Sequence, residues 1–308
     1  MEALVYKSTG SWYSVKAVDG RFYNARIKGI FKIEGITSTN PVAVGDRVEA
    51  EMENEVDATV TITGISDRRN YIARSSPHQG KDRHIIASNL DQVLLFATLR
   101  DPKTSQGFID RFLVAAEAYH VDPVIVFNKA DIYRKKELEL FKEREKIYND
   151  IGYKVILLSV QTGAGLDQVK KVLQDKITLI SGHSGVGKST FINAVLPDLL
   201  LRTNDVSNWS GKGMHTTTFA EMFDLPFDGK VIDTPGIREF GITDIPKEEL
   251  SHYFPEMRKR LNNCQFNNCI HVNEPCCAIK KAMEDGEISV ERYISYCNIL
   301  DTIEHKTY

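Results

Sequence analysis

The stretch GHSGVGKST, from Gly182 to Thr190, follows the pattern G-x-x-x-x-G-K-S of a phosphate-binding loop. The apolar run ITLIS precedes it and a helical segment begins near Lys188, which is the strand–loop–helix context that such a loop requires. Its glycines let backbone N–H groups turn towards a β-phosphate, and the helix N-terminus adds positive potential. We expect the Lys188 ammonium to bridge β- and γ-phosphate oxygens and the Ser189 hydroxyl to bind Mg²⁺. The predicted loop comprises Gly182, His183, Ser184, Gly185, Val186, Gly187, Lys188, Ser189 and Thr190.

A base-reading motif, NKAD, stands upstream of this loop, at the end of the apolar run VIVF. Asp131 can accept hydrogen bonds from N1–H and the exocyclic amine of guanine, a pair of donors that adenine does not offer. Asn128 would hold the loop and the base, and the stem of Lys129 would lie over the ring. Ala130 completes the motif. A helix N-cap is the alternative role for Asp131, and the two roles are compatible.

Two further loops complete the predicted nucleotide site. Ser159, Val160 and the glutamine after them end another apolar run, and their backbone N–H groups are expected to contact the base. The sequence DTPG supplies Asp233 for the Mg²⁺ shell, and the backbone N–H of Gly236 for the γ-phosphate.

The segment between the phosphate loop and DTPG contains HTTT, which predicts a switch that closes over Mg²⁺ and the γ-phosphate. We assign the magnesium-binding role to Thr217 by analogy with Thr-Thr pairs in other GTPase switches, although a polar loop is the alternative for any single threonine. Ile237 follows Gly236 where Ras-like enzymes have a water-orienting glutamine, and its side chain has no donor or acceptor. His215 is the nearest candidate to replace that glutamine, with a solvated loop histidine as the alternative.

The fold follows from the apolar runs that these motifs terminate. QVLLFATL, DPVIVFNK, YKVILLSV and ITLISG alternate with amphipathic segments such as FIDRFLVAAEAY, which is typical of a doubly wound, mostly parallel α/β sheet. Ligands of such sheets bind at the carboxyl ends of the strands, and four candidate motifs, NKAD, the Ser159 loop, GHSGVGKS and DTPG, each follow a predicted strand. The order of the motifs, with the base-reading loops before the phosphate loop, predicts a circularly permuted P-loop GTPase core over residues 67–244.

Residues 1–66 have a different pattern, with short alternating runs such as SWYSVKAV and ATVTITGI punctuated by glycine. This predicts an all-β, OB-like barrel of about five strands, a fold that often binds RNA. An SH3-like or purely structural barrel is the alternative. The next segment contains Arg68, Arg69, Arg74, Lys81 and Arg83 and is locally basic, which a solvated linker would also explain.

Residues 245–308 form a helical zone that carries four of the five cysteines between Cys264 and Cys277. Three thiolates and one imidazole, in the spacing Cys-x4-Cys-x-His-x5-Cys, are a tetrahedral ligand set for one structural Zn²⁺. Cys276 is an alternative to Cys277, His252 is an alternative to His271, and buried free cysteines are the alternative to a metal site. The predicted ligands are Cys264, Cys269, His271 and Cys277.

Composition limits the remaining possibilities. The chain has 308 residues and a formal net charge of -3, so any nucleic-acid binding must come from local patches. Its apolar runs are too short to cross a bilayer, and its N-terminus MEALVYKSTG lacks the apolar core of a signal peptide. We therefore expect a cytoplasmic monomer without membrane association.

These motifs together resemble the family of the ribosome small-subunit-dependent GTPase A. The likeness rests on the short barrel, the order NKAD, GHSGVGKS, HTTT, DTPG, and the cysteine–histidine knuckle, and it extends to NLD at Asn89 and IDRFL at Ile109. Val160 departs from the more common alanine. The resemblance implies a GTPase that acts late in maturation of the small ribosomal subunit, binds ribosomal RNA, is stimulated by the subunit, and leaves after GTP hydrolysis.

Two other function classes compete with that interpretation. A guanine-nucleotide sensor, responding to GTP, GDP or an alarmone and gating a protein partner with little turnover, is favoured by Ile237. An ATP-dependent RNA remodeller is disfavoured by NKAD. Hydrolysis measured with and without small subunits separates the first of these from a GTP hydrolase.

Overall fold

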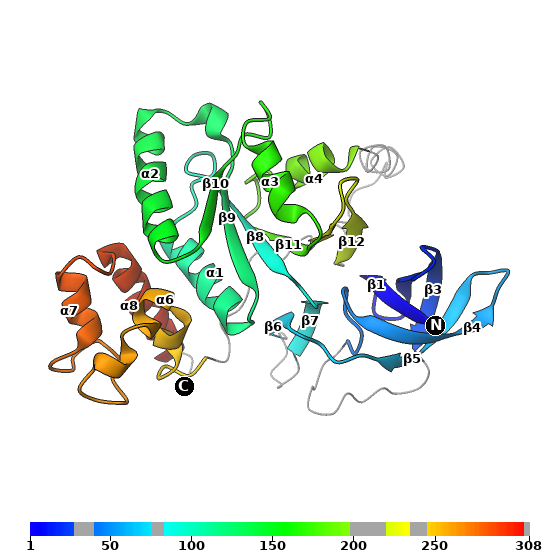
Figure 1. Cartoon of the computed structure of the whole chain (residues 1–308), viewed down its shortest axis with the longest axis horizontal. Coiled ribbons are helices and arrows are strands. Elements are labelled where there is room, and N and C mark those ends of the chain that lie inside the picture. The colour runs from blue at the N-terminus through cyan, green and yellow to red at the C-terminus, as the bar shows by residue number, and fades with distance from the viewer. Residues whose placement is uncertain (28–39, 76–82, 198–219, 235–244, 305–308) are drawn as a thin grey trace, which may run out of the picture.

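The structure, a computed structural model, describes residues 1–27, 40–75, 83–197, 220–234 and 245–304 (Figure 1). A barrel, a helix-covered sheet and a helical C-terminal zone follow one another along the chain. The barrel and the covered sheet share one continuous sheet of 11 strands. Among the described residues no helix is both long enough and apolar enough to span a bilayer.

The covered sheet has the strand order β10-β9-β8-β11-β13-β12. All neighbouring pairs are parallel except β12 with β13, so the mostly parallel sheet predicted from the apolar runs is confirmed. Every residue of β8 is buried, as expected for a central strand with both faces covered. The bounds are β8 Gln92–Ala97, β9 Asp122–Phe127, β10 Lys154–Leu157, β11 Ile177–Ser181, β12 Glu221–Asp224 and β13 Lys230–Asp233.

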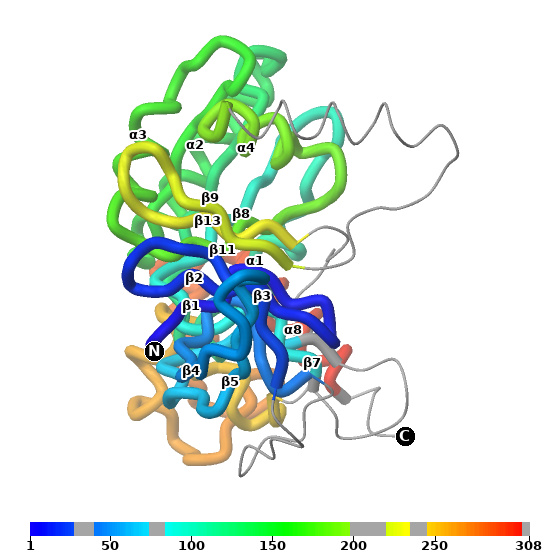
Figure 2. The backbone as a smooth tube through the Cα atoms, turned by 90° about the vertical axis from the view of Figure 1, so that its right-hand side faces the viewer, coloured from blue at the N-terminus to red at the C-terminus, as the bar shows by residue number. Residues whose placement is uncertain are grey.

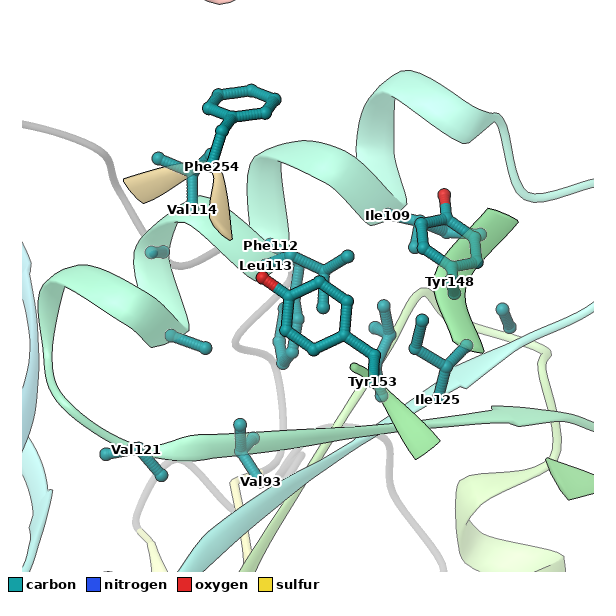
Figure 3. Close-up of a cluster of buried hydrophobic side chains, with 14 of the residues drawn as sticks. Val93, Ile109, Phe112, Leu113, Val114, Val121, Ile125, Tyr148, Tyr153 and Phe254 are labelled. Carbon is teal, nitrogen blue, oxygen red and sulfur yellow. The ribbon is translucent and has the colours of Figure 1, made fainter. Parts of the chain in front are cut away.

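Helices cover both faces of this sheet, with α1 and α2 on one side and α3 and α4 on the other (Figure 1). On α1, Ile109, Phe112 and Leu113 recur at helical spacing and are buried, and Ser105 caps the helix by accepting from the N–H of Phe108 at 3.2 Å. Figure 3 shows α1 between the strands on one side and Phe254 of the C-terminal zone on the other. The bounds are α1 Gln106–Ala118, α2 Lys135–Asp150, α3 Leu166–Leu173 and α4 Lys188–Val195.

The N-terminal strands close into a barrel with the order β1-β2-β3-β5-β4 and a final pairing of β4 with β1. Five short strands closed in this order match an OB-like barrel, so the predicted OB-like barrel is confirmed. Its core is a separate cluster that includes Val5, Val15, Val48 and Ile62. The bounds are β1 Glu2–Ser8, β2 Tyr13–Ala17, β3 Phe22–Ile27, β4 Arg47–Asn54 and β5 Thr59–Ile65.

The barrel joins the covered sheet through β12. Lys7 of β1 pairs with Glu221 of β12 through the backbone, and the two side chains form an ion pair of 2.8 Å. Asp224, at the other end of β12, accepts from the Tyr6 hydroxyl at 2.6 Å and from the Lys16 ammonium at 2.5 Å. Figure 2 shows β1 and β2, in blue, beside the segment 220–234, in yellow, which contains β12 and β13.

A hairpin of β6 (Tyr71–Ser75) and β7 (Arg83–Ser88) lies between barrel and sheet, in the basic segment for which a solvated linker was the alternative explanation. Arg68 before it forms a buried ion pair of 2.6 Å with Asp46 of the barrel, and Ser88 donates to the same carboxylate at 2.5 Å. Gly45 has φ +93°, and a Cβ there would lie 2.1 Å from the carbonyl oxygen of Ser88. Part of the basic segment is therefore an ordered connection between two folding units.

The C-terminal zone is helical, as predicted, and its residues 250–263 form three short helical pieces. Pro255 ends the first turn and occupies the start of α6, because proline removes a helical hydrogen bond but fits the first helical position. The bounds of the helical pieces are η2 Leu250–Tyr253, α6 Pro255–Arg258, η3 Leu261–Asn263, α7 Ala278–Glu284 and α8 Val290–Glu304.

A buried ionic cluster fixes this zone to the sheet-covering helices. Arg292 of α8 contacts Asp110 of α1 at 2.8 Å and Glu256 of α6 at 2.8 Å, and all three side chains are almost completely buried. Tyr148 of α2 donates to the same Asp110 carboxylate at 2.9 Å. Burial lowers the pKa of the Arg292 guanidinium, but the two nearby carboxylates outweigh that effect and raise it, so Arg292 remains charged at neutral pH.

Candidate functional site

The predicted nucleotide-binding motifs meet at the carboxyl edge of the covered sheet. NKAD follows β9, Ser159 follows β10, the phosphate loop follows β11, and Asp233 ends β13. The strand order reverses between β8 and β11, and the crevice outside such a reversal is where ligands of doubly wound sheets bind.

The phosphate loop has the backbone that its glycines predict. Gly182 has φ +135°, and a Cβ there would lie 2.3 Å from the carbonyl oxygen of Phe96. Helix α4 begins at Lys188, so its first backbone N–H groups are directed towards the loop. The Lys188 ammonium donates to the carbonyl oxygens of Gly182 at 2.6 Å and His183 at 2.8 Å, which holds its charge inside the turn.

Lys188 and Asp233 influence each other electrostatically across the site. Burial lowers the pKa of the Lys188 ammonium, and the Asp233 charge opposes that shift. Burial raises the pKa of the Asp233 carboxyl, and Lys188 opposes that shift in turn. A cation that binds beside Asp233 would favour its ionised form.

Asn128 connects three loops of the site. Its side-chain amide donates to the carbonyl oxygen of Val186 in the phosphate loop at 2.9 Å and accepts from the N–H of Val160 at 3.3 Å. Its Nδ2 atom would lie 2.4 Å from a Cβ on Gly187, so only glycine fits at that position. The first residue of NKAD therefore sets the spacing between the base-reading loops and the phosphate loop.

One carboxylate oxygen of Asp131 accepts a hydrogen bond within the protein, and the other edge of the carboxylate faces the cavity described below. Its Oδ1 atom accepts from the Ser159 hydroxyl at 2.5 Å, and the residue is exposed. It lines a cavity of about 310 Å³, near the lower limit for a small-molecule site. The cavity is lined by Asn128, Lys129, Asp131, Val160, Gln161, Gly187 and Thr190.

Two larger cavities, each of about 650 Å³, lie beside the junction of barrel and sheet. Their described lining residues come from the barrel, β12, the first residues of β11 and β13, and neighbouring loops, and none belongs to NKAD, the phosphate loop or DTPG. The residues of the predicted nucleotide site line the smaller cavity.

Three predicted residues, Thr217, His215 and Gly236, lie outside the described residues, as does Ile237. The other predicted nucleotide-site residues lie around the phosphate loop and the base-reading loops. Gln161, the third residue of the predicted second base loop, lines the same cavity as Asn128 and Asp131. Pro102, near Gly185, was not predicted.

The cysteines and histidine of the C-terminal zone form a compact metal-ligand cluster. The ligand atoms of Cys264, Cys269, His271 and Cys277 all lie within 4.8 Å of one another. His271 Nδ1 is 3.7 Å from the Cys264 sulfur and 3.4 Å from the Cys277 sulfur. Zinc bonds of about 2.3 Å to sulfur and about 2.0 Å to nitrogen require ligand separations of roughly this size. The cluster fits one structural Zn²⁺, and no carboxylate is needed to complete it.

The surroundings of the cluster hold its loop in place. Glu274 accepts from the N–H groups of Ile270 at 2.7 Å and Val272 at 3.0 Å. Tyr293 of α8 donates to the carbonyl oxygen of His271 at 2.7 Å. Without a cation, burial and the neighbouring Cys277 thiol raise the pKa of the Cys269 thiol to about 12, so a bound metal would supply the charge that stabilises the thiolate.

Adjacent cysteines give a sharp test of the ligand set. Cys277 belongs to the cluster, whereas Cys276 is exposed and outside it. We expect Cys277→Ser to reduce bound zinc from about one ion per chain to well below half, because one of four ligands is lost. Cys276→Ser should retain the metal. The zinc content per chain is measured for both purified variants. Loss of zinc from Cys276→Ser with retention in Cys277→Ser would show that Cys276 is the fourth ligand.

Comparison with known proteins places the chain in a family. The profile described as RsgA GTPase matches residues 65–243, and the profile described as RsgA N-terminal domain matches residues 2–60. The small ribosomal subunit biogenesis GTPase RsgA of Flavobacterium psychrophilum is 51% identical over 302 residues, covering 98% of this chain and 93% of that protein. The small ribosomal subunit biogenesis GTPase RsgA 2 of Bacteroides thetaiotaomicron is 51% identical over 308 residues, covering 100% of this chain and 99% of that protein.

Two solved structures have the same fold. The crystal structure of YjeQ from Thermotoga maritima superposes with a TM-score of 0.79 at 34% identity, covering 98% of each chain. YloQ, described as a circularly permuted GTPase, superposes with a TM-score of 0.77 at 30% identity, covering 100% of this chain and 96% of the other. The permuted order predicted from the motifs is therefore confirmed, and the chain belongs to the RsgA GTPase family.

Proposed function

We propose that this chain is a GTP hydrolase that assists maturation of the small ribosomal subunit. The observation that carries the proposal is the pair of hydrogen bonds of the Asn128 side chain, to Val186 and Val160, which connects the two base-reading loops with the phosphate loop. The names of the curated relatives supply the ribosomal context. The predicted separation into residues 1–66, 67–244 and 245–308 is part of the proposal, as are a monomeric state and a cytoplasmic location.

The roles within the site follow from its geometry. Asp131 reads guanine through its open carboxylate edge, and Lys129 covers the ring. Lys188, released from the carbonyl oxygens of the phosphate loop, pairs with the β- and γ-phosphates. Magnesium bound with GTP would neutralise charge that develops on phosphate oxygens, and the side chains of Ser189, Asp233 and Thr217 would hold it.

RNA contacts are assigned to the barrel and the zinc-binding zone. On the barrel, Trp12 and Phe22 are exposed aromatic side chains, and the guanidinium of Arg26 lies 3.8 Å from the centre of the Trp12 ring. Aromatic faces beside cationic groups can stack on unpaired bases and contact the backbone phosphates. This arrangement allows RNA binding by a chain of net charge -3.

His215 is proposed to orient the attacking water, because Ile237 has no polar group for that purpose. We expect His215→Ala to bind GTP with nearly unchanged affinity and to lose most of the turnover stimulated by the subunit. Nucleotide titration and single-turnover hydrolysis measure the two quantities. Unchanged stimulated turnover would return His215 to the role of a solvated loop residue.

Co-sedimentation tests the proposed partner. Purified chain is centrifuged with small or large ribosomal subunits, in the presence of a non-hydrolysable GTP analogue, GDP or no nucleotide. We expect selective binding to the small subunit, strongest with the GTP analogue. Equal binding to both subunits, or no dependence on nucleotide, would contradict the proposal.

A further inference from the structure

Tyr133 connects NKAD to a loop that the sequence did not associate with the nucleotide site. Its hydroxyl donates to the carbonyl oxygen of Asn128 at 2.7 Å and accepts from the N–H of Leu99 at 2.9 Å. The side chain is 9% exposed, and burial raises the pKa of its phenol to about 12, so the donating proton is present at neutral pH. One hydroxyl therefore pairs two backbone groups from segments about 30 residues apart in the chain.

The second segment is the β8–α1 loop, residues 98–105, which follows β8 at the point where the strand order reverses. This loop is closed by its own hydrogen bonds. Thr104 donates its N–H to the carbonyl oxygen of Thr98 at 2.7 Å, and its hydroxyl accepts from the N–H of Thr98 at 3.0 Å. The Thr98 hydroxyl donates to the carbonyl oxygen of Pro102, and Arg144 of α2 donates to that of Thr104 at 3.3 Å. The β8–α1 loop is thus a fixed support.

The same loop contacts the nucleotide-binding loops at two more places. The Lys129 ammonium donates to the carbonyl oxygen of Asp101. Pro102 lies against the phosphate loop, since its Cδ atom would be 3.6 Å from a Cβ on Gly185. Lys129 itself has φ +65°, an uncommon conformation for a lysine that the surrounding contacts must hold.

We propose that Tyr133 is a positioning residue for guanine recognition, holding Asn128 against the β8–α1 loop so that the base-reading motif is ordered before nucleotide binds. The inference rests on the proposed function, because it assumes that NKAD reads the base. Asn128 in turn fixes the phosphate loop through Val186 and the second base loop through Val160. A shift of its backbone would therefore disturb all three loops, and ordering them would then consume binding free energy.

Tyr133→Phe removes only the hydroxyl and leaves the buried N–H of Leu99 and the carbonyl of Asn128 without this partner. We expect the dissociation constant for GDP and the KM for GTP to rise about tenfold, equivalent to about 1.4 kcal/mol. The kcat at saturating GTP should stay within about twofold of wild type, since bound nucleotide restores the order of the three loops and the cost falls on binding. Fluorescent GDP titration and steady-state hydrolysis measure these values.

Tyr153→Phe is the matched control. Tyr153 is also buried under α1 (Figure 3), and its hydroxyl donates to Glu117 at 3.1 Å. It precedes β10, whereas the base-reading loops follow the carboxyl ends of β9 and β10. Both variants are expected to lower the melting temperature by a few degrees. Only Tyr133→Phe should weaken GDP binding. Equal loss of GDP affinity in both variants, or unchanged affinity in Tyr133→Phe, would overturn the inference.

A second variant tests the loop without altering NKAD. Thr104→Val removes the hydroxyl that accepts from Thr98, so the β8–α1 loop loses part of its closure. We expect GDP affinity to fall about threefold, and unchanged affinity would count against the inference even if Tyr133→Phe did not fold.

To separate this inference from the proposed function, wild-type protein is titrated with GDP and ADP in parallel. If wild type does not prefer GDP over ADP, base reading by NKAD itself is refuted. If wild type prefers GDP and Tyr133→Phe binds GDP as tightly as wild type does, only the role of Tyr133 is refuted.

Discussion

Lys188→Ala is expected to lower GTP turnover by at least about a hundredfold, the size of effect found when a preorganised electrostatic group is removed from a transition state. The half-buried ammonium is held at the turn of the phosphate loop, 2.6 Å from the Gly182 carbonyl oxygen, where the phosphates would lie. Charge on the transferred γ-phosphoryl group increases towards the transition state, so loss of the cation affects kcat as well as binding.

The control for this variant is Lys146→Ala. The Lys146 ammonium forms an exposed ion pair of 2.9 Å with Asp150 on α2, and such pairs contribute little to stability. Its removal should leave turnover within about twofold of wild type. Single-turnover hydrolysis is measured for both variants after circular dichroism has established that each is folded. Near-normal turnover of Lys188→Ala would refute the assignment of the phosphate loop.

Asp131→Asn is expected to exchange guanine preference for xanthine preference, with a change in the ratio of affinities of about a thousandfold. In xanthine a carbonyl replaces the exocyclic amine of guanine, so an amide donor pairs where a carboxylate would be repelled. The Ser159 hydroxyl, 2.5 Å from Asp131 Oδ1, can donate to the asparagine oxygen and leave the amide nitrogen directed to the base.

Competition titrations with GDP and xanthosine diphosphate measure this exchange in wild type and variant. The Ser159→Ala variant provides a graded comparison, because it removes the support for Asp131 without changing the charge that faces the base. It should weaken GDP binding while keeping guanine preference. Unchanged competition by both nucleotides in Asp131→Asn would exclude NKAD as the base reader.

The sequence predicted the covered sheet because its strands are short apolar runs and each candidate motif follows one of them. It predicted the barrel because alternation and glycine are local signals. The β6–β7 hairpin was missed because its strands include charged residues such as Arg74 and Arg83, and their pairing depends on each other and on the barrel. The break between the two helical pieces on either side of Phe254 could have been predicted from Pro255 alone.

The metal-ligand cluster was predictable from spacing, but the choice between Cys276 and Cys277 required the fold. Adjacent residues at a turn point in different directions, and Cys276 has φ +53°, which directs its side chain away from the direction a regular backbone would give. The role of Tyr133 could not be predicted for a similar reason. A tyrosine after NKAD is indistinguishable from an ordinary core residue until the β8–α1 loop is placed beside it.

The central claim is that GTP hydrolysis by this chain responds to the small ribosomal subunit, and steady-state turnover with and without purified subunits tests it most directly. The alternative, a guanine-nucleotide sensor with little turnover, rests on Ile237 and is less consistent with a chain of the RsgA GTPase family. We predict stimulation of at least about tenfold by small subunits and none by large subunits, because an ordered switch can supply groups that the free enzyme lacks. Turnover that is the same with small subunits, with large subunits and without either would contradict the account.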